Sequence, residues 1–113
     1  MISNLKKLVP VLALMIGVAT VSKAQSKYDP PQDIQMLLMK NACSGCHKPA
    51  EKLVGPSYLD LSKKKYSDEK ILALVHKPNP TDWPGYPAMS ALPSAPKADV
   101  LKIAAWINTL RKK

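Results

Sequence analysis

The sequence contains no phenylalanine, only two cysteines and two histidines, and no stretch with the apolar-polar alternation of a β-strand. Without strand patterns or internal repeats, the 113 residues predict one small all-α domain. A core of this size without phenylalanine is marginal unless something else supplies apolar bulk. Basic residues outnumber acidic ones by 17 to 8, but aromatic side chains are not interleaved with them, which argues against nucleic-acid binding. The charge instead favours a solvated face that steers an acidic protein partner.

The first 24 residues have the layout of an export signal. A basic pair at positions 6–7 precedes an apolar run from 8 to 21, and small residues follow up to Ala24. We therefore expect a signal peptide over residues 1–24, cleavage after Ala24, and a mature domain over residues 25–113 in the periplasm. An uncleaved anchor is the alternative, although the apolar run is short for a bilayer span and contains a proline. No cysteine lies near the expected cleavage site, which disfavours a lipoprotein.

Both cysteines lie in one short motif, Cys43-Ser44-Gly45-Cys46-His47, which reads C-x-x-C-H. This pattern is typical of covalent attachment of a c-type haem. Two thiols at this spacing reach the two vinyl groups of the ring and form thioethers, and the next residue is held where its imidazole can ligate iron. Gly45 lets the backbone run close to the ring. Because bacterial c-type haem is attached outside the cytoplasmic membrane, the motif and the export signal support each other.

Three other roles for the cysteines are open. A disulfide between Cys43 and Cys46 would close a strained loop. A thioredoxin-like redox pair requires a βαβ context, and none follows the motif. A zinc site requires a second pair of ligands, and only His76 remains. The adjacent His47 favours haem over all three.

Apolar residues recur at helical spacing in four segments. The first runs from about Pro30 to Ala42 and leads into the motif, with Asp29 expected as its N-cap and Pro30 at its first helical position. The other three are a short helix that starts near Tyr58 and ends in three lysines, a helix that Ser67 caps and that stops before Pro78, and a final helix from Pro96 to the C-terminal cations.

A long stretch without helical spacing, residues 78–96, separates the last two helices. It holds six prolines together with Trp83, Tyr86, Met89 and Leu92. Loops of this length in compact domains are usually functional or disordered, and the apolar content argues against disorder. We therefore expect this loop to wrap against something flat and apolar.

Met89 is the predicted second axial ligand. It lies far enough downstream of His47 to fold over the opposite face of the ring, and His/Met ligation favours ferrous iron and raises the potential. His76 is a competitor, and an open site is a further alternative. Met36 and Met39 stand only a few residues before the motif, so we expect them in core or surface packing.

Four groups of residues follow one another along the chain: Cys43 to His47, then Val54-Gly55-Pro56, then Trp83 shortly before Met89, and finally Ala105-Trp106. In this combination the chain resembles a small bacterial class I cytochrome c with a single haem. The resemblance implies the cytochrome c fold, with four to five helices around one haem c that Cys43 and Cys46 hold covalently. It further implies that the Pro56 carbonyl accepts a hydrogen bond from the His47 ring and that Trp83 approaches a haem propionate.

A chain of this kind is expected to carry single electrons and not to act as an enzyme. Its expected partners are respiratory redox proteins with an acidic docking face, such as a terminal oxidase or reductase and a quinol-oxidising complex. Contact with the membrane would come through such a complex or through an uncleaved signal. Two alternatives are a subunit through which electrons enter a larger respiratory complex, and an enzyme or sensor in which gas or peroxide reaches the iron because Met89 is loose.

Overall fold

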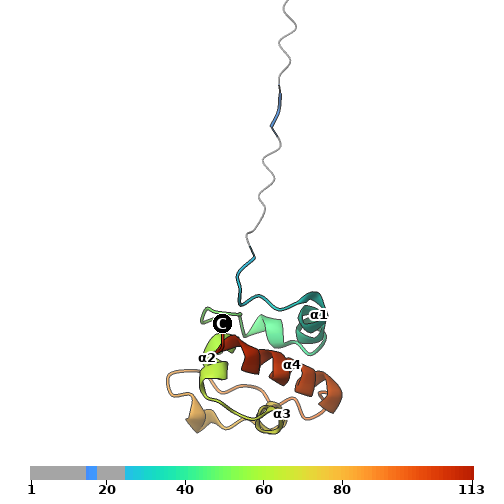
Figure 1. The fold of residues 1–113 in the computed structure, drawn as a ribbon. Coiled ribbons are helices and arrows are strands. Elements are labelled where there is room, and N and C mark those ends of the chain that lie inside the picture. Colours follow the sequence, from blue (N-terminus) through green and yellow to red (C-terminus); the bar gives the residue numbers. More distant parts are fainter. Residues whose placement is uncertain (1–14, 18–24) are drawn as a thin grey trace, which may run out of the picture.

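A computed structural model describes residues 15–17 and 25–113 of the chain (Figure 1). The expected signal peptide and its cleavage site lie outside these residues, apart from 15–17. The described residues form four α-helices and no strand, which confirms the predicted all-α class. The helices are α1 (Gln32–Lys40), α2 (Tyr58–Lys63), α3 (Asp68–His76) and α4 (Lys97–Leu110), with short 3₁₀ segments at Cys43–Gly45 and Pro80–Asp82. Within the same residues, no helix combines the length and the apolar character that a bilayer span requires.

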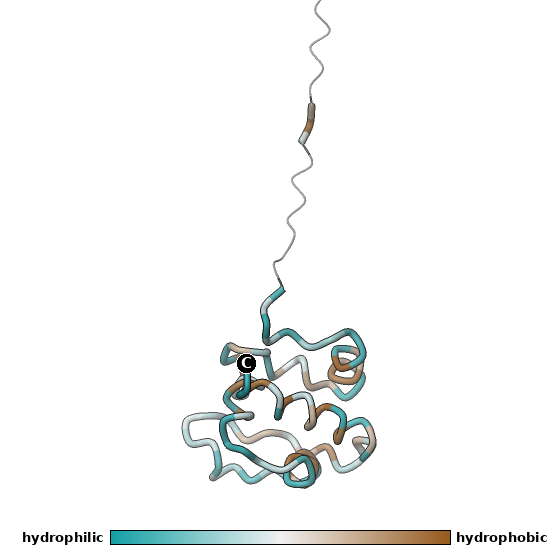
Figure 2. Tube along the Cα trace, in the orientation of Figure 1, coloured by the Kyte–Doolittle hydropathy of each residue, from teal (hydrophilic) through white to brown (hydrophobic). Residues whose placement is uncertain are grey.

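The longest helix, α4, lies at the centre of the core. It contacts each of the other three helices, and Figure 1 shows it running between α1 and α3. Its buried residues recur every three or four positions and therefore form one continuous face. Figure 2 shows apolar stretches on α1, α3 and α4. The buried residues of α4 are Val100, Ile103, Ala104, Trp106, Ile107 and Leu110, and those that face it from α1 and α3 are Ile34, Leu38 and Ile71.

Serine side chains begin both α2 and α3. The Ser57 hydroxyl accepts a hydrogen bond from the Asp60 backbone N–H at 3.0 Å, and the Ser67 hydroxyl accepts one from the Lys70 N–H at 3.1 Å. Each bond satisfies a backbone donor that has no partner within the helix. The predicted cap at Ser67 is confirmed.

The predicted start of α1 is wrong by two residues. Pro31, and not Asp29, is the N-cap, and it makes no side-chain cap. Pro31 disfavours helical backbone at Pro30, since a residue that precedes proline is pushed toward extended conformations. The Asp29 carboxylate instead accepts a hydrogen bond from the Ser26 N–H at 2.8 Å and so stabilises the turn before the helix.

Candidate functional site

The C-x-x-C-H motif folds into a tight turn directly after α1. Ala42 has a left-handed backbone (φ 58°), and Cys43–Gly45 form one 3₁₀ turn. The Cys43 carbonyl accepts hydrogen bonds from the N–H groups of Cys46 at 3.2 Å and His47 at 3.1 Å. One short turn therefore carries both thiols and the imidazole. Cys43 is half-buried, Cys46 is exposed, and both are free thiols; burial raises the pKa of Cys43, and the nearby Cys46 adds to the rise.

The His47 ring is oriented by the loop that follows the motif. Its Nδ1 lies 2.7 Å from the Pro56 carbonyl oxygen, and this is the hydrogen bond that the resemblance implied. Because a carbonyl can only accept, Nδ1 carries the proton and Nε2 keeps its lone pair. Burial lowers the pKa of His47, and the hydrogen bond to Pro56 offsets part of that shift. His47 is therefore a neutral imidazole whose Nε2 can ligate a metal.

Gly55 lies against this same ring. A Cβ at position 55 would lie 2.6 Å from Cε1 and 2.9 Å from Nδ1 of His47. The Gly55 N–H also donates to the Cys46 carbonyl at 2.7 Å, which ties the loop back to the motif. A side chain at this position cannot fit unless the imidazole moves. In the sequence, Gly55 was noted only within the group Val54-Gly55-Pro56, although a glycine directly before Pro56, the expected hydrogen-bond acceptor for His47, was a usable signal of close approach.

Two aromatic side chains connect His47 to the core helix α4. The ring centroid of Tyr58 lies 5.5 Å from that of His47, and the Trp106 centroid lies 5.2 Å from that of Tyr58 in an edge-to-face contact. Burial, followed by the charges of the two cysteines, raises the pKa of Tyr58, so its hydroxyl stays protonated. That hydroxyl and the Trp106 Nε1 are buried without a hydrogen-bond partner among the described residues. A buried phenol without a partner is uncommon, and a further polar group or a water at the motif would satisfy it.

Large apolar side chains lie exposed in the loop after the motif and in the 78–96 loop. In the loop between the motif and Pro56, Leu53 and Val54 are 39% and 48% exposed, and Met89 is 39% exposed. Because the small core leaves these residues exposed, their apolar surface can be buried against a bound group or another molecule. Met36 and Met39, by contrast, are surface residues of α1.

The loop from 78 to 96 is held at its C-terminal end by the end of α3. The Leu92 N–H donates to the Val75 carbonyl at 2.9 Å, and a ring nitrogen of His76, Nε2, donates to the Ala95 carbonyl at 2.9 Å. His76 therefore fastens the loop with one of the two ring nitrogens that could ligate a metal. Met89 lies before this fastened end.

The structure brings four of the six predicted site residues together: Cys43, Cys46, His47 and Pro56. The other two, Trp83 and Met89, lie in the 78–96 loop, where Trp83 is half-buried. Among the described residues, no hydrogen bond joins Met89 to the first four. The role of Trp83 toward a propionate and that of Met89 toward iron remain predictions.

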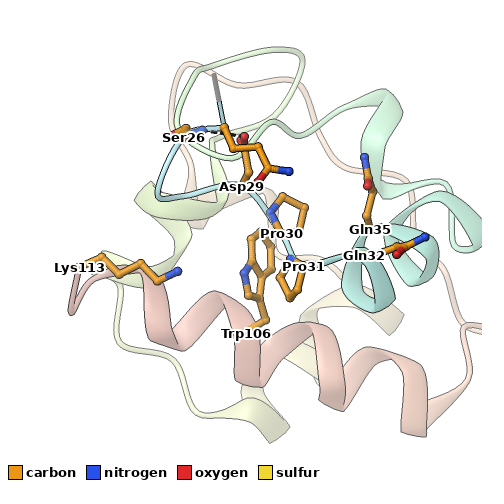
Figure 3. A pocket seen from close by; sticks show the side chains of 9 residues that line it. Ser26, Asp29, Pro30, Pro31, Gln32, Gln35, Trp106 and Lys113 are labelled. Carbon is orange, nitrogen blue, oxygen red and sulfur yellow. Dashed lines mark hydrogen bonds between the residues drawn. The ribbon is translucent and has the colours of Figure 1, made fainter. Parts of the chain in front are cut away.

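A hollow of about 680 Å³ lies beside the N-terminal end of α1, and none of the predicted site residues lines it. Figure 3 shows Pro30 and Pro31 over the indole of Trp106, with Lys113 reaching in from the C-terminal end. The lining includes both the Lys113 ammonium and the Asp29 carboxylate, so the hollow favours neither an anionic nor a cationic ligand. We interpret it as an open space between the N-terminal segment and α4, separate from the motif.

Within the described part of the chain, no three His, Cys, Asp or Glu side chains gather as they would around a metal ion. Any metal at the motif would therefore have to arrive with further ligands of its own, as iron does in a porphyrin. In comparisons with known proteins, no protein-family model matches the chain, and no curated protein matches it significantly. The assignment of a function accordingly depends on the residues of the motif and on their geometry.

Proposed function

We propose that the chain is a one-electron carrier built around one covalently bound c-type haem, with His47 and Met89 as axial ligands. The observation that carries the proposal is the hydrogen bond of 2.7 Å between His47 Nδ1 and the Pro56 carbonyl. It leaves a neutral imidazole with a free Nε2 directly after two free thiols on one turn. This donor set suits haem c and suits zinc poorly, because the described residues offer no further ligands of the kind zinc uses.

The residues around the motif fit such a group in their chemical character. Leu53, Val54 and Met89 offer exposed apolar surface that a flat ring would cover. The Tyr58 hydroxyl, buried and unpartnered, would find a polar neighbour or an ordered water. Added apolar bulk would also stabilise a small core that has no phenylalanine.

Each residue has a defined task in this proposal. The thiols of Cys43 and Cys46 each add across a vinyl group, with sulfur bonding to one carbon and hydrogen to the other, and so prevent loss of the haem. His47 donates Nε2 to the iron, and the Pro56 carbonyl, by holding the proton on Nδ1, makes that nitrogen a better donor. Met89 donates a soft, neutral thioether on the other face. The bound haem supplies the one-electron ferric/ferrous couple.

The surface charge agrees with a protein partner. Exposed lysines follow the motif at Lys48 and Lys52, and three more lie at and just after the end of α2: Lys63, Lys64 and Lys65. Such a distribution steers an acidic redox partner toward this side of the molecule. We propose respiratory proteins outside the cytoplasmic membrane as donor and acceptor, such as a quinol-oxidising complex and a terminal oxidase or reductase.

The test is a reduced pyridine haemochrome spectrum of protein from cells that can mature c-type haem, with an oxidised spectrum of the same sample. We expect a c-type spectrum and, in the oxidised protein, a far-red sulfur-to-iron charge-transfer band. Met89→Ala should remove that band and lower the potential sharply. A colourless protein with both thiols open to alkylation would overturn the haem proposal, and an unchanged band in Met89→Ala would exclude Met89 alone.

A second function has one observation in its favour. The Met89 side chain is 39% exposed, and a loosely held thioether would let a gas or peroxide reach the iron. Rapid binding of CO to the reduced wild-type protein would favour this sensor or enzyme over the carrier.

A further inference from the structure

The aromatic residues of the 78–96 loop lie on one turn, Trp83-Pro84-Gly85-Tyr86. The Tyr86 N–H donates to the Trp83 carbonyl at 3.2 Å, and Gly85 has a φ of +85°. Proline at the second position and glycine with positive φ at the third are the signature of a type II turn. The turn sets the two rings edge to face, with centroids 5.8 Å apart and planes at 87°.

Each of these rings is covered by a lysine from a different segment. Lys52 Nζ lies 4.4 Å from the centroid of Tyr86, and Lys64 Nζ lies 4.7 Å from that of Trp83. Lys64 also donates to the Asp82 carbonyl at 3.3 Å. Both distances are within the range of a cation–π attraction. We call Lys52, Lys64 and the two rings the lysine-aromatic clasp.

Lys52 is the member of the clasp that connects the loop after His47 to the 78–96 loop, which carries Met89. It lies in the loop after His47, and this loop is hydrogen-bonded to the motif through Gly55 N–H and the Cys46 carbonyl at 2.7 Å. Its partner Tyr86 lies three residues before Met89. The segment that carries the predicted first ligand therefore touches the segment that carries the predicted second ligand through Lys52 and Tyr86.

Met89 lies midway between two attachment points. Tyr86, three residues before it, is held by Lys52, and Leu92, three residues after it, donates to the Val75 carbonyl at 2.9 Å. The second attachment is a backbone hydrogen bond to the end of α3, and side-chain substitutions leave it in place. The first depends on a side-chain contact at an exposed site. Lys52 is thus the side chain that attaches this segment to the loop after His47, and a substitution can loosen that attachment.

The geometry points to Lys52 as a positioning residue: through Tyr86 it holds residues 86–92 closed, and so keeps the Met89 thioether over the iron. This inference rests on the proposed function, since it concerns a ligand of the same haem. Lys52 acts through Tyr86 and does not itself touch the ligand. An exposed cation–π contact is weak, so its loss should raise the open fraction of the segment about two- to fivefold.

The experiment compares CO binding to the reduced holoprotein in four variants and the wild type. Lys52→Gln and Tyr86→Leu should each raise the CO association rate about two- to fivefold, because CO enters when Met89 leaves the iron. Tyr86→Phe keeps the ring face and should behave as the wild type. Lys112→Gln makes the same change of charge at an exposed site on the C-terminal residues and should also leave the rate unchanged.

A second measurement tests the contact without the haem iron as reporter. In NMR spectra of the ferrous, diamagnetic protein, the ε-methylene protons of Lys52 should be shifted upfield by the ring of Tyr86. The shift should persist in Tyr86→Phe and disappear in Tyr86→Leu. Lys52→Gln and Lys112→Gln with equal CO rates, in a wild type that shows the far-red band, would overturn the role of Lys52 and leave the proposed function intact. A wild type without bound haem would overturn both.

Discussion

The two sides of the molecule bury their apolar residues in different ways. On the side of α4, Leu110 and Ala104 are fully buried, and Ile107 is 3% exposed, against partners from α1 and α3. In the loops, Leu53 after the motif and Met89 in the 78–96 segment are each 39% exposed. The helices thus bury their apolar residues in a shared core, apart from Met36 and Met39 of α1, whereas Leu53 and Met89 in the loops lie outside that core.

This difference indicates on which side of the fold a further component would pack. The loops around the motif are ordered by backbone hydrogen bonds, such as those from Gly55 N–H to the Cys46 carbonyl at 2.7 Å and from Tyr58 N–H to the Lys48 carbonyl at 3.0 Å. Hydrogen bonds fix geometry but add little net stability. A side that is well oriented and poorly packed is suited to receive a large apolar group. The proposed haem would complete it.

The largest predicted effect is a truncation on the helical side. Leu110→Ala should lower the free energy of unfolding by about 2–5 kcal/mol, because the side chain is fully buried in the core. The matched variant on the motif side is Leu53→Ala. If Leu53 stays exposed, Leu53→Ala should lower the free energy of unfolding by no more than about 0.5 kcal/mol. If a haem covers Leu53 in the holoprotein, the loss should exceed about 1 kcal/mol.

Chemical denaturation of both variants as holoproteins, at one pH and temperature, checks this comparison. The control is Met36→Ala, since Met36 is an exposed apolar residue on α1, away from the motif loops. A cost for Leu53→Ala as small as that for Met36→Ala would show that nothing covers Leu53.

The next effect concerns the ring of His47. Gly55→Ala would place a Cβ 2.6 Å from its Cε1, so the imidazole or the loop must move. We expect a loss of about 1–3 kcal/mol of stability together with a changed reduction potential, since the bond to Pro56 is disturbed. Ala50→Gly is the control, because it makes the reverse change at an exposed residue of the same loop and adds no atom near His47. Equal effects on the potential in the two variants would contradict a specific role for Gly55.

The fold was predictable from the sequence to the extent that it depends on local signals. Helical spacing gave four helices, and a serine before acidic residues gave the cap at Ser67. The start of α1 was misplaced because Asp29 and Pro30 form a good local cap signal, and the effect of Pro31 on the preceding residue was not weighed.

The candidate site was only half predictable, for a similar reason. Cys43, Cys46 and His47 are adjacent in sequence, so their spacing alone indicates the chemistry. The contacts of Tyr58 with Trp106 and of Lys52 with Tyr86 join residues far apart in the chain, and a single sequence carries no signal for such pairs. The turn at Trp83 to Tyr86 was an exception, since its Pro-Gly pair is readable as a type II turn.

A smaller effect is expected at the turn between α2 and α3, on the helical side. Lys65 has a φ of 56°, a left-handed backbone that costs energy for any residue with a Cβ. Lys65→Gly should raise the free energy of unfolding by about 0.5–1 kcal/mol, after the entropy that glycine costs is subtracted. Lys63→Gly removes the same charge within helix α2 and should lower stability by about 0.5–1 kcal/mol. Thermal unfolding of Lys65→Gly and Lys63→Gly measures the effect of the left-handed backbone at Lys65. If both substitutions change the free energy of unfolding in the same direction, this effect is contradicted.

The smallest effect lies at the seam between the two sides, where α1 leads into the motif and α4 begins. Lys40, in the last turn of α1, lies 2.8 Å from the carboxylate of Asp99, and the Asn41 side chain donates to the same oxygen at 3.3 Å. These hydrogen bonds, that of Lys40 above all, hold the pKa of Asp99 below its ordinary value. Asp99→Asn should therefore lower the unfolding temperature slightly at pH 7.

The effect of this substitution should depend on pH with a definite sign. The pKa of Asp99 is lower in the folded protein than its unfolded value of about 3.9, so between these two pH values the unfolded chain binds more protons. The stability that ionised Asp99 contributes is therefore present above about pH 4. It is lost as the pH falls through the folded pKa. The difference between wild type and Asp99→Asn should accordingly vanish in acid. Glu69→Gln is the matched control, because Glu69 is also an acid in the first turn of a helix. If both variants lose the same amount of stability at pH 7, the helix dipole alone accounts for the effect. The ion pair between Asp99 and Lys40 then does not join the two sides.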